Sequence, residues 1–139
     1  MSLIVDASVA TKWYLAETDS SLAQQLVEAG HELIAPDLLL VEVASAFFKA
    51  WSREIIDDGH MDRALSQLPT AFAALWPLQE LVADAMVISR ILRHPVYDCV
   101  YLALAWRTGD KIVTADERVL EVARASTWDH FLIRLRDAV

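Results

Sequence analysis

A chain of 139 residues has the length of one ordinary domain, and we expect a single domain over residues 1–139. Its net charge of −8 argues against binding of nucleic acid through a broad basic surface, so a nucleic-acid site would be local or would depend on bound cations. Hydrophobic residues make up 55% of the chain and the mean hydropathy is +0.31, which indicates apolar surface for a partner or a second subunit.

Neither a membrane span nor a secretory signal is expected. The first residues lack a basic stretch, and a charged residue, Asp6, follows early. Glu42 and Asp98 interrupt the longest apolar runs before they reach the roughly 18 residues that a span needs. The single cysteine, Cys99, excludes an internal disulfide and is typical of a reducing compartment. We therefore expect a cytoplasmic protein with no membrane partner.

The first half of the chain alternates short apolar runs with helical patterns. Serine, proline and glycine residues mark the expected boundaries. In chain order, we expect a strand at 3–5, a helix capped by Ser8, a helix from Ser20 or Ser21 to Gly30, a strand at 32–35 and a long helix capped by Asp37 that ends near Trp51.

The second half continues this alternation after a turn at 57–59. In chain order, we expect a helix from His60 that ends near Pro69 or continues kinked toward Leu75, a helix at 79–93, a helix from Asp98 to Arg107 with Gly109 as its cap, a strand at 111–114, a short helix through 119–123 and a tail from Trp128 that is either strand or helix. The order of elements predicts an α/β fold, a three-layer α/β/α sandwich around a central, mainly parallel sheet.

Four acidic residues stand in apolar surroundings, unlike the acidic clusters of an ordinary solvated surface. They are Asp6, Glu42, Asp98 and Asp116. An ionised carboxylate is costly to bury unless it is paired, hydrogen-bonded or bound to a metal. Taken singly, Asp6 and Asp98 could each be a helix cap, since aspartate favours that position.

Their placement indicates a shared site. Asp6 and Asp116 follow predicted strands, where open α/β sheets build their sites, and Glu42 and Asp98 lie in the first turns of predicted helices. No cationic motif next to them in the sequence accounts for their neutralisation. Carboxylate oxygens suit Mg²⁺ or Mn²⁺, and such a cluster is typical of phosphate chemistry. The hydroxyls of Ser8 and Thr114 could orient a water or a carboxylate there, or serve only as a cap and a strand end.

Other kinds of site find no support. The histidines, His31, His60, His94 and His130, are scattered and form no zinc-binding pattern, and none lies beside a serine as a catalytic triad requires. Three glycines in the whole chain exclude a glycine-rich phosphate loop.

Four segments resemble the PIN-domain family, and in particular the VapC-type toxins of toxin–antitoxin operons. The matching segments each carry one of the four acids: residues 4–13 (IVDASVATKW), 35–46 (APDLLLVEVASA), 97–105 (YDCVYLALA) and 113–118 (VTADER). They follow the family's order and spacing over nearly the whole chain.

The resemblance implies an endoribonuclease that hydrolyses RNA phosphodiester bonds with Mg²⁺ or Mn²⁺ and leaves a 5′-phosphate. Asp6 and Asp98 would be the principal metal ligands, with Asp116 and Glu42 completing the shell directly or through water. The resemblance also implies a cognate antitoxin as partner and a homodimer.

Two alternatives stay open. The chain could be a non-catalytic PIN-like module for protein association, which its apolar content and negative charge favour. It could also be an aspartyl-phosphate phosphatase of the haloacid-dehalogenase type, which places an aspartate after its first strand. That enzyme wants a second acid two residues later, where this chain has Ser8.

Overall fold

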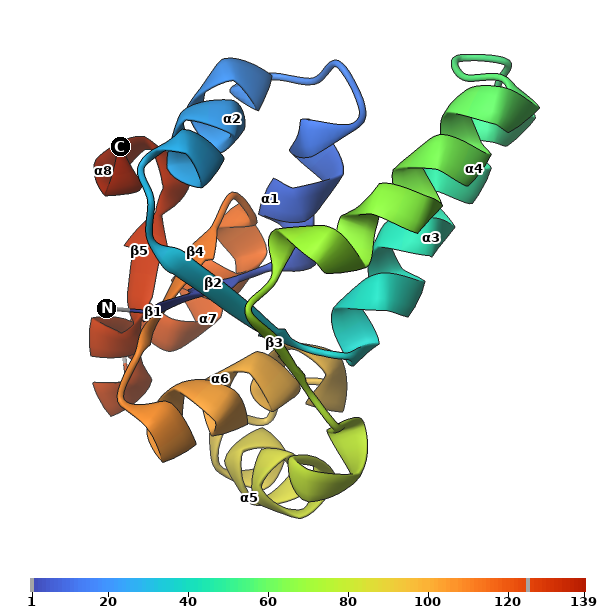
Figure 1. The fold of residues 1–139 in the computed structure, drawn as a ribbon. Helices are drawn as coiled ribbons and strands as arrows, with labels where there is room; N and C mark the ends of the chain where they lie inside the picture. The colour runs from blue at the N-terminus through green and yellow to red at the C-terminus, as the bar shows by residue number, and fades with distance from the viewer. Residues whose placement is uncertain (1, 125) are drawn as a thin grey trace.

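A five-stranded sheet forms the centre of the molecule in a computed structural model that describes residues 2–124 and 126–139. Every neighbouring pair of strands is parallel, in the order β3-β2-β1-β4-β5 (Figure 1). The strands are β1 Ser2–Val5, β2 Glu32–Pro36, β3 Ala74–Trp76, β4 Lys111–Thr114 and β5 Leu132–Arg134. The three central strands are apolar runs with almost no exposed side chain, as expected for a parallel sheet covered on both faces.

Helices cover both faces of the sheet. The α-helices are α1 Ala7–Ala10, α2 Ser20–Glu28, α3 Leu38–Ser52, α4 Asp58–Gln67, α5 Val82–Leu92, α6 Val96–Thr108, α7 Glu117–Arg124 and α8 Leu135–Ala138, and 3₁₀ turns occur at Thr11–Trp13, Leu68–Ala71, Leu78–Glu80 and Thr127–Phe131. In Figure 1, α1, α2 and α3 lie above the sheet, and α5 and α6 lie below it. Helices α3 and α4 contact each other and extend side by side away from the sheet. The predicted three-layer α/β/α sandwich is confirmed.

Helix α6 lies at the centre of the lower layer. It contacts β1, β2, β4 and α5, and its seven consecutive residues 99–105 are all buried. A helix that is apolar on every side needs such an environment, since it has no face to offer to water. Gly109 ends it in the left-handed conformation at φ +78°, as the sequence predicts.

One strand was not predicted, and another was left open. We expected a helix that ends near Pro69 or continues kinked toward Leu75, where the three-residue edge strand β3 lies. The tail from Trp128, predicted as either strand or helix, forms a 3₁₀ turn, β5 and α8 in succession. Both are short edge strands, which bury too few residues to show an apolar pattern. A short strand at the edge of a sheet is therefore defined by its neighbour more than by its own sequence.

Several predicted caps were wrong. Asp6 occupies the N-cap position of α1, so Ser8 lies inside that helix, and Asp19 precedes α2 in place of a serine. Residues 57–59, predicted as a turn, form the start of α4 instead. The carboxylate of Asp57 accepts the His60 N–H at 2.8 Å and caps the helix. Asp37 does precede α3, but its carboxylate accepts the Leu78 N–H instead.

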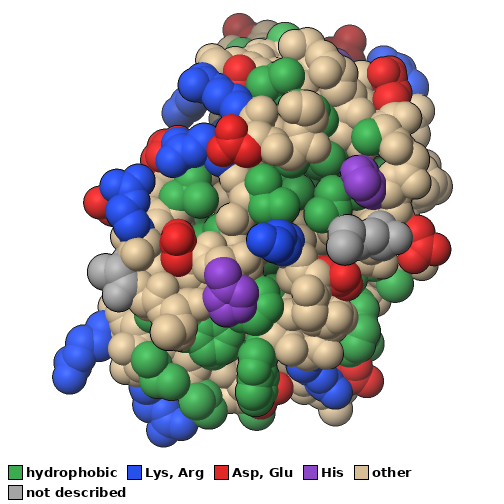
Figure 2. All heavy atoms as spheres, turned by 90° about the vertical axis from the view of Figure 1, so that its left-hand side faces the viewer, with side chains coloured by type: hydrophobic (Ala, Val, Ile, Leu, Met, Phe, Trp, Pro, Cys, Tyr) green, Lys and Arg blue, Asp and Glu red, His purple; other side chains and the backbone are tan. Residues whose placement is uncertain are grey.

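The surface is apolar in places, as the composition suggested. Figure 2 shows hydrophobic side chains in the middle and toward the lower end of the face in view, with basic residues among them. A cavity of about 350 Å³ in this lower layer is lined by Val87 and Ile91 of α5 together with Trp106 and Trp128. Within the described residues, no helix is both long enough and apolar enough to cross a membrane.

Candidate active site

Two of the four acids lie at the carboxyl ends of adjacent strands. Val5 pairs with Val113 in the parallel register of β1 and β4, and the Asp6 N–H donates to the Val113 carbonyl at 3.0 Å. Asp6 follows β1 directly and is only 8% exposed, whereas Asp116 follows β4 by two residues. The sheet register therefore brings these two segments, 110 positions apart in the sequence, to one edge.

Two hydroxyl groups hold the buried Asp6 carboxylate. Ser8 Oγ donates to Asp6 Oδ2 at 2.5 Å, and Thr114 Oγ1 donates to the same oxygen at 3.0 Å. Backbone N–H groups fix both hydroxyls, since Ala115 donates to Ser8 Oγ and Asp116 donates to Thr114 Oγ1, each at 3.0 Å. Ser8 and Thr114 therefore have a definite role here, which is to orient Asp6 and to tie the β1 segment to the β4 segment.

Glu42 lies on the second turn of α3, and a tyrosine of α6 holds it. Tyr101 Oη donates to Glu42 Oε1 at 2.6 Å, and Tyr101 itself is only 3% exposed. This contact links the helix above the sheet to the helix below it. Asp98 and Tyr101 are three residues apart on α6 and hence lie on neighbouring positions of one helix face.

Asp98 lies in the first turn of α6, where the helix dipole favours a negative charge. Its Oδ2 is 2.5 Å from Nε2 of His94, a residue in the loop before the helix. Both side chains are mostly buried. His94 was not among the predicted site residues, although it precedes Asp98 by four residues and therefore lies within reach of it.

Asp116 has a cationic partner, which corrects the expectation that none of the four acids would be neutralised by a neighbour. Its carboxylate accepts the backbone N–H of Arg118 at 2.9 Å, and the Arg118 guanidinium lies 3.2 Å from Oδ2. Arg118 is exposed, and its pKa is raised by the hydrogen bond to Asp116 and by the charges of Asp116, Asp98 and Asp6. A single arginine thus faces three of the four acids.

The four carboxylates act on one another electrically. Burial raises the pKa of Asp6 above its usual value; the bonds from Ser8 and Thr114 oppose this effect, and the charges of Asp98 and Asp116 add to it. Burial also raises the pKa of Glu42 to about 7, against the hydrogen bond from Tyr101 and with a contribution from Asp6 and Asp98. Such mutual repulsion requires the groups to lie near one another.

The donor set fits a hard divalent cation better than it fits a closed ion-pair network. Asp6 is buried against hydroxyl groups alone, so its charge lacks a direct cationic partner among the contacts of the described residues. As the side chains lie, no group of three histidine, cysteine or acidic residues within residues 2–124 and 126–139 is arranged to hold a metal ion. Asp98 and Asp116 would have to turn from His94 and Arg118 toward Asp6, and shared metal binding by all four acids stays a prediction.

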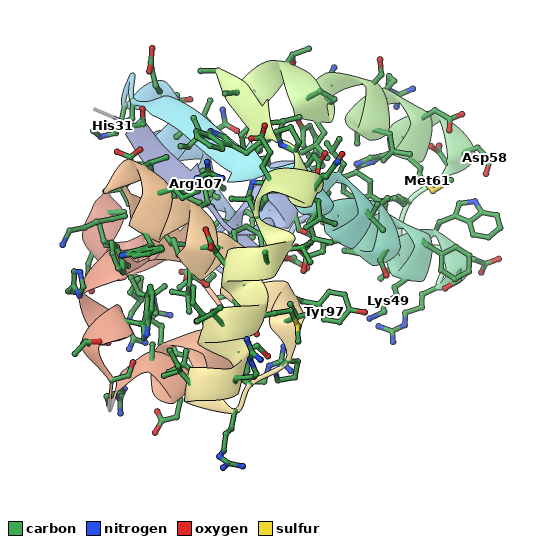
Figure 3. The ribbon with its side chains drawn as sticks, turned by 90° about the horizontal axis from the view of Figure 1, so that it is seen from below. His31, Lys49, Asp58, Met61, Tyr97 and Arg107 are labelled. Atoms are coloured by element: carbon green, nitrogen blue, oxygen red, sulfur yellow. The ribbon has the colours of Figure 1, made fainter. Side chains whose placement is uncertain are left out.

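Two exposed side chains border the region between α3 and α6. Tyr97 is 61% exposed and immediately precedes Asp98, and Lys49 is exposed on α3. In Figure 3, Tyr97 extends from the start of α6 in the direction of Lys49. Tyr97 therefore places an aromatic ring accessible to solvent next to Asp98 in the chain.

Comparison with known proteins agrees with this arrangement. A model of the PIN domain matches residues 3–125. Ribonuclease VapC3 of Pyrobaculum aerophilum is 34% identical over 125 residues, which cover 87% of this chain and 94% of that protein.

Solved structures share the fold at low identity. The crystal structure of PAE2754 from Pyrobaculum aerophilum has a TM-score of 0.71 and 20% identity, covering 98% of this chain and 85% of that one. VapBC2 from Rickettsia felis bound to a DNA fragment from their promoter has a TM-score of 0.66 and 8% identity, covering 96% and 98%. A toxin–antitoxin complex from Klebsiella pneumoniae has a TM-score of 0.64 and 14% identity, covering 85% and 89%. Because a family model spans most of its length and a VapC ribonuclease is 34% identical over most of both chains, the chain belongs to the PIN-domain family and is a relative of the VapC ribonucleases.

Proposed function

We propose that this protein is a metal-dependent endoribonuclease and the toxin of a VapBC-type toxin–antitoxin pair. The observation that carries the proposal is the buried carboxylate of Asp6 at the carboxyl edge of a parallel sheet, which two hydroxyl groups hold and no cationic side chain contacts among the described residues, with Asp116 after the adjacent strand. The 34% identity to a VapC ribonuclease over most of both chains supports the reaction class. Family membership also disfavours the aspartyl-phosphate phosphatase alternative. Such an enzyme would need a second acid at the position where this chain has Ser8.

The residues would divide the work as follows. Asp6 and Asp98 would hold Mg²⁺ or Mn²⁺, and Glu42 and Asp116 would complete the shell directly or through water. A cation held by these residues would lower the pKa of its bound water and would neutralise charge on the scissile phosphate. Ser8 and Thr114 keep Asp6 in one orientation, and Arg118 is free to move from Asp116 to a phosphate, since its side chain is exposed.

The net charge of −8 does not exclude RNA binding, because basic side chains lie in segments next to Asp116. Lys12, Arg134 and Arg136 line a cavity of about 230 Å³ next to Ala115 and Glu117, close in sequence to Asp116. Each is paired with an acid in exposed or partly exposed contacts, which contribute little to stability and exchange readily. Such pairs can open to admit phosphate groups of a bound RNA, so binding does not need a basic protein.

The proposal predicts that purified protein cleaves single-stranded RNA in millimolar Mg²⁺ or Mn²⁺ and not in excess chelator. Products should carry 5′-phosphates. The control is Asp98→Asn purified in parallel, which should lose at least about 100-fold in rate, because a lost ligand costs no less than a lost supporting group. Calorimetric titration with Mn²⁺ should show binding to the wild type and weaker binding to the variant. This measurement needs no knowledge of the RNA sequence that the protein cleaves.

Two results would count against this function. Equal cleavage by both proteins would reveal a contaminating nuclease. Absence of Mn²⁺ binding to the wild type would leave the non-catalytic association module as the better description.

The proposed partners are a cognate antitoxin and a second copy of the chain. Exposed apolar residues support both, among them Val41, Phe48 and Trp51 on α3 and the cavity residues Val87 and Ile91 on α5. Co-expression with the product of the adjacent small reading frame should give a stable complex in which RNA cleavage is suppressed. Light scattering of the isolated toxin should give twice the mass of one chain, and a monomer at micromolar concentration would exclude the homodimer.

A further inference from the structure

The hydroxyl group of Tyr101 connects the three segments that carry the acids Asp6, Glu42 and Asp98. The residue belongs to α6, one turn after Asp98. Its Oη donates to Glu42 of α3 at 2.6 Å, and the backbone N–H of Ala7, the residue after Asp6, lies close enough to act on the tyrosine oxygen. Tyr101 also lines, together with Asp6, Asp98 and Thr114, a small cavity between α6 and the carboxyl ends of β1 and β4.

This position is unusual in a helix that is otherwise filled with apolar side chains. Residues 99–105 are all buried. In this run, the hydroxyl group of Tyr101 is the polar group that contacts one of the four acids. A buried hydroxyl needs a hydrogen-bond partner, and here that partner is Glu42, one of the four acids. Because Asp98 and Tyr101 share a helix face, any shift of Glu42 relative to Asp98 would break the bond.

We propose that Tyr101 is a positioning residue of the nuclease site, which holds Glu42 at a fixed place relative to Asp6 and Asp98. The inference rests on the proposed function. Without the hydroxyl, the Glu42 side chain on α3 has the rotameric freedom of any half-buried glutamate, and the site would have to order it when a cation binds. Supporting groups of this kind typically contribute 10–100-fold to metal affinity or activity.

The test is a double-mutant cycle on Tyr101→Phe and Glu42→Gln, read by Mn²⁺ calorimetry and by RNA cleavage. Tyr101→Phe removes one oxygen and keeps the ring that fills the core. We expect Mn²⁺ affinity and kcat to fall by about tenfold each, with KM for RNA changed less than about twofold. In the Glu42→Gln background the same change should have little further effect, since the two residues act as one unit.

A matched control removes a hydroxyl elsewhere. Tyr14→Phe changes a partly buried tyrosine that packs edge-on against Phe47, away from the four acids. It should leave Mn²⁺ affinity and kcat unchanged. Circular dichroism and thermal unfolding of each variant separate a loss of fold from a loss of site geometry.

A second variant keeps the test decisive if Tyr101→Phe does not fold. Ala7→Pro removes the N–H that lies near the tyrosine oxygen, and proline is well tolerated at the first position of a helix. It should weaken Mn²⁺ binding in the same direction by about threefold, a fraction of the effect of a lost supporting group.

The outcomes distinguish the two proposals. Unchanged Mn²⁺ affinity in folded Tyr101→Phe, or a tenfold loss that persists in the Glu42→Gln background, would overturn the positioning role alone. A wild type that neither binds Mn²⁺ nor cleaves RNA would overturn the proposed function and this inference with it.

Discussion

Asp6→Asn should abolish RNA cleavage while making the metal-free protein more stable. Asparagine retains an oxygen that accepts the hydroxyls of Ser8 and Thr114, so the local structure should survive. It removes a buried carboxylate, whose pKa is raised by burial and by the charges of Asp98 and Asp116. Without that charge, the free-energy cost of burying an ionised carboxylate disappears, which stabilises the folded state. The same substitution removes the proposed metal ligand. We expect a rate loss of more than about 100-fold, above the range for supporting groups.

Thermal unfolding in chelator and single-turnover cleavage in Mn²⁺ measure the two effects on the same preparation. The control is Asp62→Asn, which changes an exposed aspartate on α4 and should alter neither. A metal-free Asp6→Asn protein that unfolds at a lower temperature than the wild type would show that Asp6 serves the fold, as an ordinary N-cap does. Opposite changes in stability and activity are the signature of a residue kept for function.

The metal-free protein should lose stability as the pH rises from 5 to 8. Folding raises the pKa of Glu42 from 4.5 to about 7, so the folded state binds the proton more tightly than the unfolded state does. The resulting stabilisation is complete below pH 4.5 and disappears as the pH rises through about 7. Because Glu42 is only partly buried, we discount the shift for solvent screening and expect a loss on the order of 1–2 kcal/mol. The raised pKa of Asp6 acts in the same direction.

Urea unfolding in chelator at several pH values measures this loss, and Glu42→Gln isolates its source. The variant should show a smaller decrease from pH 5 to pH 8 than the wild type. Mn²⁺ should restore stability most at pH 8, where the carboxylates are ionised, by about 2.7 kcal/mol at a concentration 100 times its Kd. Identical pH profiles for the wild type and Glu42→Gln would contradict the assignment.

The candidate site was largely predictable from sequence because its acids break apolar patterns. Asp6, Glu42 and Asp98 each stand alone in a run that a folded chain would bury, and the cost of burying a charge makes such exceptions informative. Strands β1, β2 and β4 were predictable for the same reason, since a central parallel strand is a continuous apolar run.

What escaped prediction depends on contacts between distant segments. Nothing local distinguishes Tyr101 from an ordinary core aromatic, because its partner Glu42 lies 59 positions away. The edge strands β3 and β5 are defined by pairing with β2 and β4 and have only three residues each. His94 and Arg118 were within reach of sequence reasoning, by spacings of four and two residues from an acid.

Helix α6 carries the proposed metal ligand Asp98 and a fully buried stretch of the hydrophobic core, and this has a consequence for genetic screens. Substitutions that rescue cells from a toxin are selected for loss of activity, and they arise equally from a damaged centre or from an unstable chain. Because residues 99–105 have no solvent-facing position, replacements throughout this stretch would be recovered alongside those of Asp98. A map of inactivating mutations would therefore outline the whole helix, and only measurements on purified, folded variants would separate catalytic residues from the packing around them.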